Sequence, residues 1–331
     1  MKSVILDKKS ESRYLFEIDG LKCFRVENVA SYSYEHCTPV LNLKIHEPSQ
    51  IRVECDGVAI VPTWYFVLDN PAGSHAFSHW VYEAFIFYPI LEKLRKINPS
   101  IKIVASLSRN YMMNLLKFFK LQSSANIPLC TDLAQSSTFD IANGGNICFF
   151  PYFLCLNDMD IDSLFLKKLM RMCMDDIARL IPSQAQSPMG TQHPPEKTLL
   201  TILPRQSKDN YSSYPHDRIV PLIEDIKQKI VSIGGTVLDT YYINNMGTQF
   251  DIVARSKTII LDWGASMLVN GMAAKGAKII VLDNFGHYSQ LKYPGIKAIF
   301  DVINENNTVV VLQPKNGCGT TITFEDISVH L

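Results

Sequence analysis

Residues 257–284, KTIILDWGASMLVNGMAAKGAKIIVLDN, carry the clearest pattern of secondary structure in the chain. Residues 258–261 and 278–282 are short apolar runs rich in β-branched side chains, as is typical of buried strands. The segment between them has apolar residues at helical spacing and a glycine, Gly276, where a helix would end. A strand–helix–strand unit this short connects parallel strands, so the stretch predicts a parallel sheet.

The turn inside this unit is Asp262-Trp263-Gly264-Ala265-Ser266. It follows its strand directly and therefore lies at the carboxyl edge of the predicted sheet, where open α/β sheets bind ligands. Its small residues would let a ligand approach the backbone N–H groups at the start of the helix. Those groups favour anions, so the turn predicts a site for a group such as a diphosphate.

Length and composition limit the classes of protein to consider. A chain of 331 residues suggests two domains, and 47% hydrophobic with 19% charged residues is enough to build sizeable cores. The 32 basic residues are balanced by 32 acidic ones, which argues against a general nucleic-acid binder. No apolar window has the length of a membrane span and no signal peptide is visible, so we expect a soluble, cytoplasmic protein.

The eight cysteines are scattered, with no CxxC pair and no metal-ligand spacing. Several lie in apolar runs, which favours buried free thiols in a reducing compartment over disulfides or a metal site.

Two α/β domains are expected on either side of a polar linker. Residues 1–181 begin with β-rich sequence, including an Asp19-Gly20 hairpin signal, and continue with alternating strands and helices, one of which Pro89 should kink or split. Residues 182–195, PSQAQSPMGTQHPP, form the linker. Residues 196–331 alternate regularly between strand and helix. This alternation predicts a doubly wound, Rossmann-like fold for the second domain, and two similar α/β domains would place a ligand cleft between them.

Basic and polar residues follow the predicted strands of the second domain. Arg205 and Lys208 follow the first strand and could clamp a diphosphate, although a solvated loop is the alternative. Arg218 precedes a helix, where a helix-start or ion-pair role is favoured. Gln249 is also near the carboxyl edge and could bind the ligand there, but a cap or a solvated polar group is an equally good interpretation. Asp283 ends the last strand of the unit and could bind a ribose diol or cap its own turn.

His79 and Glu83 stand four residues apart and share one helix face in the first domain. Such a pair could remove the proton of a sugar hydroxyl, or it could be a structural histidine bonded to its neighbour. No third metal ligand accompanies the pair, so we expect no metal. The chain also lacks a G-x-G-x-x-G fingerprint after a strand, a Walker loop and a G-x-S-x-G elbow.

These short pieces occur in an order that resembles the family 61 glycosyltransferases, also described as capsular polysaccharide biosynthesis proteins. That family shows a strand ending near an Arg, a helix preceded by an Arg, a Gln before a short helix, an HGA…N turn and a strand ending in an acid. The matching residues are Arg205, Arg218, Gln249, Trp263, Gly264, Ala265, Asn270 and Asp283. Residues 77–83 are similar to the family's GHW..E helix.

The resemblance implies a glycosyltransferase (a hexosyl- or pentosyltransferase) of the GT-B type, inverting and metal-independent, without a cofactor. Residues 196–331 would bind the nucleotide-sugar donor, expected to be a UDP-sugar, through Arg205, Lys208 and the backbone at 264–266. Residues 1–181 would bind a glycan or glycoconjugate acceptor, with His79 or Glu83 as the base. Polysaccharide biosynthesis is the implied process.

Trp263 is a departure from the family, which has a His at that place. Its indole could replace the His by stacking on a base or a sugar. The same substitution keeps two alternatives open: a catalytically inactive glycan- or nucleotide-binding scaffold protein, or another sugar-nucleotide enzyme. Against a dehydrogenase or an epimerase stands the missing glycine fingerprint.

Overall fold

The computed structural model describes residues 4–6, 13–27, 31–34, 44–46, 53–55, 58–60, 63–68, 80–81, 84–106, 110–121, 123–127, 138–140, 146–151, 163–184, 199–204, 220–238, 245–284, 286, 291, 294–314 and 321–331. The chain divides into two compact units, Met1–Leu169 and Met170–Leu331. The division falls inside helix α4 (Ser163–Gln184), which continues through Pro182 into the stretch expected to be a linker. Residues 185–195 of that stretch lie outside the described residues.

Unit 1 is built around a mixed sheet with the strand order β10-β9-β8-β12-β3-β2-β5. Strands β10, β9, β8 and β12 run parallel to one another, whereas β3 is antiparallel to both β12 and β2. The strands are β2 (Arg13–Ile18), β3 (Leu21–Glu27), β5 (Lys44–His46), β8 (Thr63–Leu68), β9 (Lys102–Ser106), β10 (Ser123–Ile127) and β12 (Asn146–Pro151). The parallel part therefore carries an antiparallel extension made from the N-terminal segment.

The hairpin expected at Asp19-Gly20 joins β2 to β3. Both turn residues have positive φ, 51° and 69°, as a two-residue hairpin turn of the I′ type requires. Further N-terminal strands pair outside the main sheet, and the β-rich start is thereby confirmed. They are β1 (Val4–Leu6) and β4 (Ser31–Tyr34), which form a small sheet with β11 (Thr138–Asp140), and the antiparallel pair of β6 (Val53–Cys55) and β7 (Val58–Ile60).

Pro89 breaks the helical segment of unit 1, as its ring dictates. It occupies the first turn of α2 (Tyr88–Ile97), where a missing N–H costs no helical hydrogen bond, and the residues before it form the short 3-10 helix η2 (Phe85–Phe87). Helix α3 (Asn110–Phe118) then connects β9 to β10. Alternating parallel strands and helices confirm an α/β organisation for this unit.

Unit 2 contains a sheet with the strand order β14-β13-β15-β16-β17, in which each neighbouring pair is parallel. The strands are β13 (Leu199–Leu203), β14 (Thr236–Val237), β15 (Ser256–Asp262), β16 (Lys278–Leu282) and β17 (Thr308–Leu312). The strand–helix–strand unit predicted at 257–284 is present as β15, α7 (Ala265–Ala273) and β16. The fold class is thus mixed α/β with two parallel-rich sheets.

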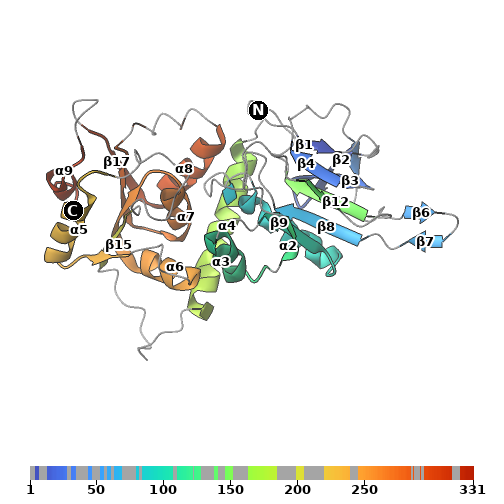
Figure 1. Ribbon diagram of the computed structural model, residues 1–331, viewed down its shortest axis with the longest axis horizontal. Helices are drawn as coiled ribbons and strands as arrows, with labels where there is room; N and C mark the ends of the chain where they lie inside the picture. Colours follow the sequence, from blue (N-terminus) through green and yellow to red (C-terminus); the bar gives the residue numbers. More distant parts are fainter. Residues whose placement is uncertain are drawn as a thin grey trace. The chain divides into compact units, whose positions relative to one another are not determined.

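Helices cover both faces of the unit 2 sheet. In Figure 1, α5 (Ile223–Ser232) and α9 (Phe324–Ser328) lie on one side of β15 and β17, and α6 (Met246–Arg255), α7 and α8 (Pro294–Asn306) lie on the other. This is the doubly wound arrangement: right-handed crossovers place helices on opposite faces of a parallel sheet when the chain reverses its direction across the strands, as it does after β14.

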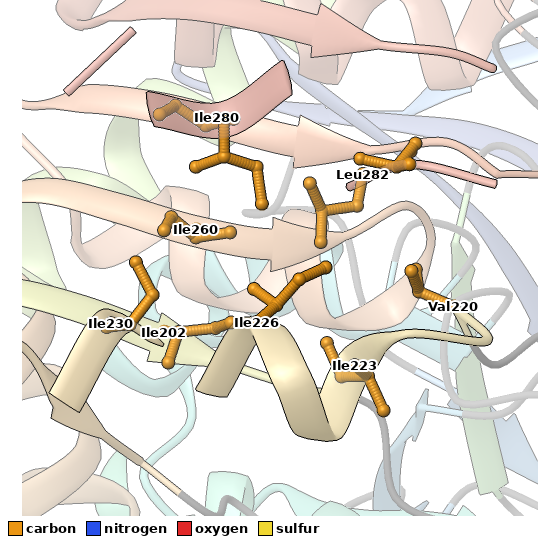
Figure 2. Packing of buried hydrophobic residues seen from close by; sticks show 10 residues of the cluster. Ile202, Val220, Ile223, Ile226, Ile230, Ile260, Ile280 and Leu282 are labelled. Carbon is orange, nitrogen blue, oxygen red and sulfur yellow. The ribbon is translucent and has the colours of Figure 1, made fainter. Parts of the chain in front are cut away.

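The core beneath α5 explains why the strands are apolar. Ile226 and Ile230 of α5 face Ile202, Ile260 and Ile280 from three neighbouring strands, and all five side chains are fully buried (Figure 2). Each such burial stabilises the fold by about 1.5–3 kcal/mol. Because the opposite face is covered too, these strands are apolar at almost every position rather than at alternate ones.

Helix α5 ends at a glycine pair. Gly234 has φ +85°, and its N–H bonds to the carbonyl of Val231, while the N–H of Gly235 bonds to the carbonyl of Ile230. These two bonds form a Schellman motif, which terminates the helix and turns the chain into β14.

Candidate functional site

The carboxyl end of β15 leads directly into α7. Asp262 is the last residue of the strand, and the N–H of Trp263 adds one more ladder bond, 3.1 Å to the carbonyl of Leu282. The chain then reverses at Gly264, whose φ of 118° and ψ of −140° are accessible almost only to glycine. The glycine therefore sets the sharp turn between strand and helix.

The first turn of α7 has no side-chain cap. Its N-cap residue is Gly264, which has no side chain to accept the first N–H groups. By contrast, Asn245 Oδ1 accepts from the N–H of Gly247 at the start of α6, at 2.9 Å. Uncapped N–H groups at a helix N-terminus, together with the helix dipole, favour an anion.

The strand order places this turn at a topological switch point. The chain passes from β13 outward to β14, and then returns to β15 on the other side of β13. In open parallel sheets, ligands bind outside the carboxyl ends of the two strands that flank such a reversal. The two segments concerned here are the one that follows β13 after Pro204 and the turn at 262–266.

Gln249 and Asn270 meet behind the turn. Gln249 Nε2 donates to Asn270 Oδ1 at 2.6 Å, and Asn270 Nδ2 donates to the carbonyl and the hydroxyl of Ser266, at 2.8 and 3.2 Å. Gln249 is 5% exposed and Asn270 is 2% exposed. These two predicted donor-binding residues are thus brought together, and they hold the first turn of α7 from within.

Trp263 points into the core. Its side chain is 6% exposed, and its ring lies 5.9 Å from the ring of Phe300 on α8, centroid to centroid, at an interplanar angle of 37°. The packing therefore places the indole against protein rather than presenting it for stacking on a base or a sugar.

Two acidic residues lie at neighbouring strand ends: Asp262 is the last residue of β15, and Asp283 directly follows β16. Both are buried, at 4% and 1% exposure. Asp283 Oδ2 accepts from Gln313 Nε2 at 2.8 Å, and the N–H of Asp283 bonds to the carbonyl of Leu312. Asp283 therefore ties β16 to the end of β17. Gln313 has no local sequence pattern around it that would mark it as a site residue.

In unit 1, Trp80 is fastened to the corresponding edge of its own sheet. Its Nε1 donates to the carbonyl of Leu68, the last residue of β8, at 3.3 Å, and its side chain is fully buried. The strand order reverses here as well, because the chain runs outward through β9 and β10 and returns to β12 on the other side of β8. The residue next to His79 is thus held at a second switch point.

Several predicted site residues lie outside the described residues, so their interpretations stay predictions. They are His79, Glu83, Arg205, Lys208 and Arg218. The backbone of Ala265 is described as the first residue of α7.

No protein-family model matches the chain, and no curated protein matches it. Two features can be read from the described parts of the chain themselves. No helix there is long and apolar enough to cross a membrane. No group of three potential metal-ligating side chains is found in the same parts, and the metal-independent site stays a prediction.

Proposed function

We propose that the chain is a glycosyltransferase that moves a sugar from a nucleoside-diphosphate sugar, with a UDP-sugar as the expected donor, to a hydroxyl group of a glycan. The observation that carries the proposal is the position of the uncapped start of α7. It lies at the carboxyl end of β15 and at the switch point of a doubly wound sheet. The family 61 resemblance, on the residues given above, supplies the reaction class.

The chemistry follows from the charge that develops during the reaction. As the acceptor oxygen forms a bond to the anomeric carbon, the bond to the diphosphate oxygen breaks, and the leaving group takes the electron pair. The N–H groups of residues 264–266, with Arg205 and Lys208, would stabilise that growing negative charge without a metal. In-line attack would invert the anomeric configuration.

The acceptor hydroxyl must lose its proton during the attack, and His79 or Glu83 is the proposed base. Support comes from the neighbouring Trp80, which the carbonyl of Leu68 holds at the carboxyl end of β8. The GT-B arrangement, with donor and acceptor bound by different domains, is part of the proposal.

Ligand-dependent thermal unfolding tests the donor class. We expect UDP or GDP to raise the melting temperature in the presence of EDTA, and CMP and NAD to have a weaker effect. A ligand at 100 times its dissociation constant stabilises a protein by about 2.7 kcal/mol. Stabilisation by NAD alone would contradict the proposal.

A catalytically inactive nucleotide-binding protein is the second candidate. It is favoured by Trp263, which replaces the family's His and is buried against Phe300. Binding of a nucleoside diphosphate without consumption of any sugar nucleotide, in the presence of a panel of glycan acceptors, would select this candidate.

A further inference from the structure

The amide pair of Gln249 and Asn270 has a fixed orientation. An amide group carries its donors and its acceptor on different sides, so a buried amide satisfies both only in one rotamer. Asn270 turns Nδ2 toward Ser266 and therefore Oδ1 toward Gln249, whose Nε2 supplies the matching donor. The donor from α6 thus decides which way the Asn270 amide faces.

This orientation reaches the backbone of the turn. Asn270 Nδ2 holds both the carbonyl and the hydroxyl of Ser266, one helical turn earlier, at the point where α7 leaves Gly264. The contact joins α6, which connects β14 to β15, to the first turn of α7, which connects β15 to β16. A small rotation of that first turn would change the direction of its N–H groups. Misplacing such groups by about 1 Å is enough to weaken their interaction with a bound ligand strongly.

We infer that Gln249 and Asn270 are positioning residues: they fix the direction of the N–H groups at 264–266 without touching the ligand. The inference rests on the proposed function, since it assigns the donor diphosphate to that turn. It gives a role to two residues that the sequence had suggested as direct donor contacts. Their burial at 5% and 2% exposure, and their bond to each other, suit an indirect role better.

The same unit offers a matched control. Thr201 and Ser256 form another buried side-chain pair, 2.7 Å between their hydroxyl oxygens, and Ser256 also donates to the carbonyl of Ile252. Both are fully buried. Ser256 begins β15, however, at the opposite end of the strand from the turn. Ser256→Ala therefore removes both hydrogen bonds of this hydroxyl, far from the first turn of α7.

Gln249→Met and Gln249→Glu are the variants of choice. The first keeps the side-chain length and removes the donor to Asn270. The second offers only acceptors, so the Asn270 amide must turn its NH₂ group toward position 249 and release Ser266. Asn270→Asp removes the donor to Ser266 while keeping an acceptor for Gln249, and it provides the same comparison if Gln249→Glu fails to fold.

The experiment compares these variants with Ser256→Ala in two measurements. The comparison uses variants whose melting temperatures are lowered by the same amount. The first is hydrogen exchange of a peptide covering 264–270 in the ligand-free protein, and the second is the dissociation constant of UDP. We expect exchange of that peptide and the UDP dissociation constant each to rise roughly tenfold in the Gln249 variants. Ser256→Ala should change neither by more than about twofold.

The outcomes separate the inference from the function on which it rests. Equal exchange and equal affinity in Gln249→Met and Ser256→Ala would overturn the inference and leave the proposed function standing. If the wild-type chain binds no nucleoside diphosphate, the proposed function fails, and the donor-site role falls with it. Faster exchange at 264–270 in that case would still support the positioning of the turn.

Discussion

Trp263 packs its indole against the ring of Phe300, which joins the turn after β15 to helix α8. The tryptophan occupies the position that the family resemblance would give to a histidine. Its burial makes it part of the core, so the side chain at this position contributes packing to unit 2.

Trp263→Ala should therefore lower the free energy of unfolding by about 3–5 kcal/mol, the usual cost of truncating a buried aromatic side chain. Urea denaturation measures the loss. A double-mutant cycle with Phe300→Ala should give a coupling of about 0.5–1.5 kcal/mol. A loss below about 1 kcal/mol would mean that the indole does not pack as described.

Gly264→Ala tests the backbone of the turn. A methyl group at this position meets no atom within 4 Å, so the cost comes from the positive φ alone, about 1–3 kcal/mol. Gly234→Ala is the matched control, because Gly234 also has a positive φ and open space but ends α5 at the other edge of the sheet. Both variants should be less stable in urea, and only Gly264→Ala should weaken UDP binding. Equal affinities of the two variants for UDP would mean that the ligand does not bind at this turn.

Gly271 has a different reason to be a glycine. A Cβ atom there would lie 2.6 Å from Ile303 Cδ1, because α7 and α8 pack closely. Gly271→Ala should cost about 1–3 kcal/mol by overpacking. Ile303→Val removes the clashing methyl group, so the double variant should be more stable than the sum of the two single effects predicts. Additive losses would argue against this contact.

The buried thiols should be unreactive in the folded protein. Burial raises the pKa of Cys23, Cys148 and Cys173, so little thiolate forms at mildly alkaline pH. Iodoacetamide at about pH 8 should leave these three unmodified in native protein and should alkylate them in urea. Mass spectrometry of tryptic peptides reports both results, and rapid native alkylation of Cys173 would contradict its burial.

An ion-pair cluster joins α5 to α9 and gives a pH dependence. Lys229 Nζ lies 3.1 Å from Asp225 Oδ2 and 3.2 Å from Glu325 Oε1. The pKa of Glu325 is lowered, mainly by a backbone hydrogen bond and then by Lys229. Its contribution to stability is therefore present above its ordinary pKa of 4.5 and is lost as the pH falls through the lowered value.

Glu325→Gln should accordingly lower stability slightly at neutral pH and flatten its decline below about pH 4.5. The effect should be small because these side chains are exposed. Urea unfolding from about pH 3 to 7 measures it. Parallel pH profiles for wild type and variant would show that Glu325 does not take part.

The sequence predicted those elements whose signal is local. A strand buried on both faces must be apolar throughout, which is why 258–261 and 278–282 could be recognised. Asp19 and Gly20 are among the few residues that tolerate the positive φ of a two-residue turn.

What the sequence could not show are contacts made by folding. Gln249 and Asn270 meet only because α6 and α7 pack side by side. The sequence of neither helix indicates that these two side chains form a hydrogen bond. Likewise, the sequence around Trp263 is the same whether its ring faces a ligand or Phe300. Spacing can place a residue at an edge of a sheet, but it does not decide whether the side chain is buried there.

Binding of a nucleotide-sugar diphosphate at the turn of 262–266 is the basis of the proposed function. Hydrogen exchange of the wild-type chain with and without saturating UDP or GDP, in EDTA, measures it. We expect slower exchange in peptides covering 262–270, with the amino edge of the unit 2 sheet unchanged. Binding that protects other segments and leaves 262–270 unaltered would contradict it.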